Sequence, residues 1–142
     1  MKKILVAIDG SPQALAALET LVGKFEFFRS TPKVTLIHVH PPIPYKAAAA
    51  WVGKETVHRY YDEESDAALA SAREALAKRG LPFEFVKRVG QPAEEIVTQA
   101  AAGGFDIIAM GTHGHTALGN LVMGSVATRV VATSTVPVLL MK

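Results

Sequence analysis

Glycine residues near the end of this 142-residue chain have a spacing that suits an anion-binding loop. The pattern is Gly111-Thr112-His113-Gly114, then nine residues, then Gly124-Ser125. An apolar run precedes it, and a run typical of a helix follows it. Glycine lets the backbone approach a phosphate closely, and a helix N-terminus directs N–H groups and partial positive charge towards it. The spacing alone is equally compatible with a series of turns, so both interpretations stand at this point.

Strand and helix patterns alternate along the whole chain, and the predicted strands and helices must position this loop. The pattern predicts strands at Lys3–Ile8, Val34–Val39, Phe83–Val89, Phe105–Met110 and Pro137–Met141. It predicts helices at 12–28, at 55–79, from Pro92 onwards, and at Ser125–Ala132, with a loop of about a dozen residues after Pro41. Such alternation indicates one α/β domain over residues 1–142, an open, doubly wound, five-stranded parallel sheet with helices on both faces.

The expected strand order places two parts of the sequence at one crevice. Right-handed crossovers leave few arrangements, and we favour the order 3-2-1-4-5. Ligands of open α/β sheets bind where the order reverses, beyond the carboxyl ends of the strands. Here that point lies between the first strand, which ends at Asp9, and the fourth, which ends at Gly111. The topology and the glycine spacing therefore indicate the same site.

Composition narrows the classes of partner. Fifteen basic and thirteen acidic residues are too balanced to indicate nucleic-acid binding. No apolar run reaches the roughly 18 residues of a membrane span. Cysteine is absent, which excludes disulfides and thiolate metal sites and suits the cytoplasm. No Asp or Glu occurs in Ile107–Lys142, as expected for an anion site and equally for a buried apolar segment.

The residues also match a known family. The pattern G-x2-G-x9-G-[S/T], after a strand ending Met110-Gly111, resembles the nucleotide-binding signature of the universal stress protein family. The opening strand with its Asp9-Gly10-Ser11 turn, the His38-Val39 pair and the closing strand at Thr135–Leu140 also resemble those of the family. Only the stretch from about Pro41 to Val52 does not, so the resemblance covers nearly the whole chain.

The resemblance implies an ATP-binding homodimer. By analogy, the glycines and Ser125 would line the triphosphate and ribose, whereas Asp9 and Val39 would lie near the adenine and ribose. The predicted cofactor-binding residues are Ala7, Asp9, Ser11, Val39, Met110, Gly111, Thr112, His113, Gly114, Gly124, Ser125 and Val126. The apolar last strand, Val136–Met141, would be an exposed edge that pairs with its copy across a two-fold axis, unless a loop or helix covers it.

Asp9 and the histidines have more than one interpretation. Asp9 could position a water, a ribose hydroxyl or a divalent cation such as Mg²⁺ or Mn²⁺ on the nucleotide. It could instead be a helix cap or turn residue before Ser11, and we favour the role near the ligand. His113 and His115 are too few to indicate a metal site. His115 stands where many relatives carry Lys or Arg, so charge neutralisation there would depend on pH. We interpret His38 and His40 as buried or rim side chains.

Three functions fit these observations. The first is an ATP-binding regulatory module of the stress response, which reports its state to an unidentified protein partner. The second is a slow ATPase or phosphate-transferring enzyme, and the third is a nucleotide-free dimeric scaffold. Phosphoryl transfer needs positioned cations and an oriented nucleophile. Because the glycine loop contains no Lys or Arg and Asp9 is the only nearby base, the enzyme has less support than the module.

Overall fold

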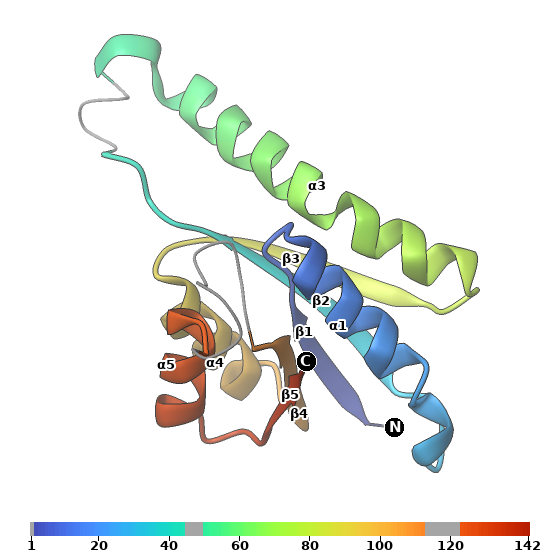
Figure 1. Ribbon diagram of the computed structural model, residues 1–142. Coiled ribbons are helices and arrows are strands. Elements are labelled where there is room, and N and C mark those ends of the chain that lie inside the picture. Colours follow the sequence, from blue (N-terminus) through green and yellow to red (C-terminus); the bar gives the residue numbers. More distant parts are fainter. Residues whose placement is uncertain (1, 45–49, 113–122) are drawn as a thin grey trace.

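The computed structural model describes residues 2–44, 50–112 and 123–142, which form one parallel sheet (Figure 1). Its order, β3-β2-β1-β4-β5, confirms the predicted topology. The strands are β1 (Lys3–Ala7), β2 (Lys33–His40), β3 (Phe83–Val89), β4 (Ile107–Gly111) and β5 (Val138–Met141). All four strand pairings are parallel. The carboxyl ends of β1 and β4 therefore lie side by side at the point where the strand order reverses.

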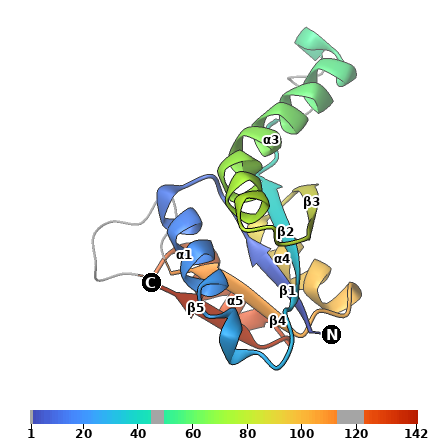
Figure 2. The same cartoon turned by 90° about the vertical axis from the view of Figure 1, so that its right-hand side faces the viewer.

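Helices cover both faces of the sheet, as predicted. They are α1 (Pro12–Val22), α3 (Lys54–Lys78), α4 (Pro92–Ala102) and α5 (Ser125–Thr133). Helices α1 and α3 pack on one face, whereas α4 and α5 pack on the other (Figure 1). The N-terminal half of α3 extends beyond the sheet (Figure 2). None of the helices in the described part of the chain is long and apolar enough to cross a membrane.

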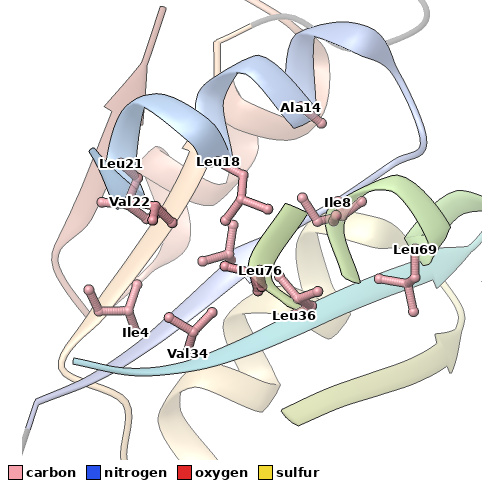
Figure 3. Close-up of a cluster of buried hydrophobic side chains, with 13 residues drawn as sticks. Ile4, Ile8, Ala14, Leu18, Leu21, Val22, Val34, Leu36, Leu69 and Leu76 are labelled. Atoms are coloured by element: carbon pink, nitrogen blue, oxygen red, sulfur yellow. The ribbon is translucent and has the colours of Figure 1, made fainter. Parts of the chain in front are cut away.

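Alternation along the strands divides the buried side chains between two apolar layers. In β1, Ile4 and Val6 face α1 and α3, whereas Leu5 faces α4 and α5. Figure 3 shows the first layer, in which Leu18 of α1 and Leu76 of α3 meet over the sheet. Because helices cover both faces, the central strands are apolar at nearly every position, which is the signal that the sequence carries for a parallel sheet.

The first helix is shorter than predicted. It ends at Val22, and a single 3-10 turn at Phe25–Phe27 follows. Gly23 is the C-cap, and its N–H donates to the carbonyl of Glu19 at 3.0 Å. Glycine is a poor helix former, and the short turn lets Phe28 pack against the apolar layer. The predicted loop after Pro41 also differs, because residues 50–52 are helical.

A tight turn joins β1 to α1 and fixes the first half of the candidate site. Gly10 has φ +83°, and a Cβ at this position would lie 3.1 Å from the Cα of Ala68 in α3. Only glycine satisfies both the left-handed backbone and the close approach. Ser11 then caps α1, since its Oγ accepts from the amide of Ala14 at 3.1 Å. The Asp-Gly-Ser sequence is thus the structural link between β1, α1 and α3.

Candidate functional site

A cavity of about 290 Å³ lies at the carboxyl ends of the strands, where the topology predicts a ligand site. Asp9 and Gly111, from the ends of β1 and β4, both line it. Residues from the start of α4 and of α5 complete its wall. The volume is close to the lower bound of small-molecule sites, about 300 Å³. The point between β1 and β4 where the strand order reverses is therefore also the site of a cavity.

One wall of the cavity is apolar. Ile37 and Val39 of β2, Met110 of β4 and Ile96 of α4 line it, and all four are buried. They belong to the apolar layer beneath α4 and α5, which extends up to the cavity. A flat, weakly polar group such as a nucleobase loses little hydration against such a wall.

The first residues of α5 form another part of the cavity wall. Helix α5 begins at Ser125 with Gly124 as its N-cap, and its first internal hydrogen bond runs from Thr128 N to Gly124 O at 3.0 Å. The amides of Ser125, Val126 and Ala127 precede that ladder, and all three residues line the cavity. An anion placed here would receive hydrogen bonds and the positive end of the helix dipole.

Asp9 serves as a turn residue and also lines the cavity. Its Oδ1 accepts from Ser11 N at 2.9 Å and from Ser11 Oγ at 2.5 Å. The two interpretations of Asp9 are therefore compatible, because one carboxylate oxygen holds the turn while the residue lies in the cavity wall. Ser11 is only 3% exposed and does not line the cavity. It instead orients Asp9 through these two hydrogen bonds.

The remaining predicted residues fall into two groups. Those that line the cavity with Asp9 are Ala7, Val39, Met110, Gly111, Thr112, Gly124, Ser125 and Val126. His113 and Gly114 lie outside the described residues, as does His115. The sequence prediction missed two lining residues from α4, Pro92 and Ile96. The packing of α4 against α5 and the sheet brings Pro92 and Ile96 there, and neither residue carries a local signal. The other lining residues that it missed are Ile8, Ala14, Ile37, His38, Pro41 and Ala127.

Charge at the cavity is sparse. Within residues 2–44, 50–112 and 123–142, Asp9 is the single acidic residue in the wall, and neither Lys nor Arg contributes. The same ranges contain no group of three or more His, Asp or Glu side chains placed to hold a metal ion. One carboxylate fits a cation that arrives with a phosphate ligand better than it fits a resident metal.

Comparison with known proteins places this geometry in a family. The model of the universal stress protein family matches residues 1–142. The chain belongs to this family. A universal stress protein of Thermus aquaticus is 33% identical over 142 residues, which cover 99% of this chain and 98% of the relative.

Solved structures of universal stress proteins share the fold. A Methanocaldococcus jannaschii protein superposes with a TM-score of 0.81 at 33% identity, covering 99% of this chain and 95% of the other. An Archaeoglobus fulgidus universal stress protein in complex with dAMP has a TM-score of 0.70 at 21% identity, covering 100% and 98%. An Arabidopsis thaliana member with AMP bound has a TM-score of 0.68 at 19% identity, covering 100% and 92%.

Proposed function

We propose that this universal stress protein binds ATP in the cavity between β1 and β4 and acts as a cytoplasmic regulatory module. The observation that carries the proposal is the pairing of an apolar wall with the three leading amides of α5 in one cavity. A purine fits the wall, and a phosphate fits the amides. Family members with AMP and dAMP bound support an adenine nucleotide as the class of ligand.

Charge balance favours a nucleotide that brings its own cation. The α5 N-terminus supplies only about half a positive charge, and Asp9 would repel the phosphates. Mg²⁺ or Mn²⁺ on the triphosphate would offset both effects, with Asp9 reaching the cation directly or through water. We therefore expect ATP to bind more weakly when EDTA removes divalent cations.

The module would act as a homodimer through β5. Among the residues that the structure describes, this strand pairs with β4 alone, and Leu139 on it is 37% exposed. An apolar edge of this kind pairs readily with a second copy of itself. Nucleotide occupancy would then shift the population of dimer or of bound partner, because Thr112, which lines the cavity, donates its N–H to the carbonyl of Met141 on β5 at 3.1 Å.

A direct experiment is to denature the purified protein and identify released nucleotides by mass spectrometry. ATP in the supernatant, or binding of added ATP by isothermal titration, supports the regulatory module. Release of ADP or AMP, followed by measured turnover, would favour the slow enzyme instead. If no nucleotide is released and added ATP produces no heat, the proposal is wrong and the scaffold alternative gains.

A further inference from the structure

The chain that leaves β2 contributes to the wall of the candidate cavity. Ile37 and Val39 of β2 line the cavity, and so does Pro41, which follows the end of the strand and is exposed. The three residues are two positions apart, which is the spacing of side chains on one face of a strand. Pro41 therefore extends the apolar wall by one position beyond the end of the sheet.

The sequence of this segment leaves few ways to hold it in place. Residues 41–44 read Pro-Pro-Ile-Pro, and proline has no backbone N–H. Ile43 therefore carries the only backbone donor of the four residues, and it donates to the Oη of Tyr61 in α3 at 3.0 Å. The residue before the segment is fixed separately, since the carbonyl of His40 accepts from Gly90 N at 3.0 Å. One hydroxyl of α3 thus receives the only backbone N–H of residues 41–44.

Packing fixes the ring that carries this hydroxyl. Tyr61 is 7% exposed and lies on the buried stripe of α3, with Val57 four residues before it and Ser65 four residues after it. Its ring packs against that of His40, with centroids 5.1 Å apart and an interplanar angle of 66°. The position of the hydroxyl is therefore set by α3 and β2, and it does not depend on the segment that it holds.

We propose that Pro41 packs against the base of the bound nucleotide and that Tyr61 is the positioning residue that keeps Pro41 in the cavity wall. This inference rests on the proposed function. The base is favoured over the phosphates because Pro41 continues the row of Ile37 and Val39, whereas the leading amides belong to α5. A proline ring also loses almost no conformational freedom when a base covers it.

The first experiment asks whether the base touches Pro41. Pro42 is the matched control, because it is also exposed but does not line the cavity. With ATP bound, nuclear Overhauser effects should join the purine protons to the ring of Pro41 and not to that of Pro42. Pro41→Ala should lower the affinity for ATP about fourfold in isothermal titration, which corresponds to one fully covered methylene group or two half-covered ones. Pro42→Ala should bind ATP as wild type does.

The second experiment tests the role of Tyr61. Tyr61→Phe keeps the packed ring and removes the acceptor of the Ile43 N–H. Tyr60→Phe is the matched control, because Tyr60 is the neighbouring tyrosine and its ring also packs against His40, with centroids 5.6 Å apart. Apparent affinity falls with the fraction of protein that is competent to bind, and one hydrogen bond changes the underlying ratio by up to about tenfold. We expect Tyr61→Phe to lose about threefold in affinity for both ATP and AMP, and Tyr60→Phe to match wild type.

Hydrogen exchange of the Ile43 amide gives a readout that a purely structural bond would not change. If ATP binds best when residues 41–44 are held, then by linkage ATP must strengthen the hold on them. We expect exchange of this amide to slow when ATP is added to wild-type protein, and to be faster in Tyr61→Phe than in wild type. An amide that exchanges equally fast with and without bound ATP would overturn the positioning role.

The outcomes separate this inference from the proposed function. If wild-type protein binds neither nucleotide, the proposed function fails and the contact with Pro41 fails with it. If wild type binds ATP but the purine shows no Overhauser effect to Pro41, only this inference is wrong. A loss in Tyr61→Phe that is seen with ATP and absent with AMP would also contradict it, because the contact would then lie on the outer phosphates.

Discussion

The amide of Gly124 donates a hydrogen bond of 2.7 Å to the carbonyl of Thr112. This bond joins the end of β4 to the N-cap of α5, although twelve positions of sequence separate the two residues. Both residues line the cavity, so the bond holds the leading amides of α5 against the carboxyl end of β4. The two halves of the glycine pattern thus meet at the candidate phosphate end.

Gly124→Val is expected to abolish nucleotide binding while leaving the fold intact. Gly124 has φ −57° and ψ 151°, which valine adopts without strain. Its branched side chain would, however, occupy the space beside the amides of α5 that a phosphate needs. Titration with ATP should show a loss of at least about a hundredfold, or roughly 2.7 kcal/mol.

Gly23→Ala is the control for this substitution, because Gly23 caps α1 in an ordinary helical conformation away from the cavity. It should bind ATP as wild type does. Gly114→Val, at a position outside the described residues, should behave as Gly124→Val does. If both valine variants are folded and still bind ATP, the site is elsewhere.

Gly10→Ala should destabilise the protein by about 2 to 3 kcal/mol in urea unfolding. The cost combines a positive φ of 83° with a Cβ that would meet the backbone of Ala68 at 3.1 Å. Gly80→Ala is the matched control, because Gly80 has φ +65° with nothing within 4 Å of an added Cβ. Equal losses at the two positions would mean that the contact with α3 contributes nothing.

Leu139→Lys should convert a dimer into a monomer. A lysine on an edge strand disfavours pairing with a second copy, since two like charges would face each other across the two-fold axis. Light scattering after gel filtration gives the mass directly. Val89→Lys changes a similarly exposed side chain on the other edge strand and should leave the mass unchanged. A monomeric wild type, or a dimeric Leu139→Lys, would refute the β5 interface.

Lys87→Met should remove about 0.5 kcal/mol of stability at neutral pH. Lys87 Nζ lies 3.1 Å from Asp66 Oδ1 and 3.4 Å from Asp62 Oδ1, which ties β3 to α3. The hydrogen bond with Asp66 raises the pKa of Lys87 above its ordinary value. A raised pKa means stability that is complete at neutral pH and lost as the pH rises above about 10. Urea titrations of both proteins at pH 7 and pH 11 check this, and a difference that grows at high pH would contradict it.

We also expect the affinity for ATP to depend on pH, through His115 and below neutral pH. An imidazole gains charge as the pH falls towards 6, so ATP should bind more tightly at pH 6 than at pH 8. His115→Gln should remove most of that difference. Equal wild-type affinity at the two pH values would show that the loop histidine does not assist phosphate binding.

Much of the site was predictable because its signals are local. Glycine spacing, an apolar run ending at Asp9, and Ser125 at a helix start are read within a few residues each. His38 shows the limit of such reading. The sequence favoured a buried or rim side chain, and burial is correct, but its position in the cavity wall and its bond to Ser65 depend on a helix 27 residues away. No periodicity within β2 or α3 encodes which two polar side chains will meet.

The sequence by itself determined the strand and helix order, the parallel topology and the position of the switch point, because alternation, apolar strands and right-handed crossovers leave few other arrangements. The tertiary structure decided what surrounds that point. It brought Ile96 into the wall, placed Thr112 against Gly124, and joined His38 to α3. These contacts depend on how the helices pack across the sheet. Side-chain shape and hydrogen-bond geometry select the partners, which are far apart in the sequence.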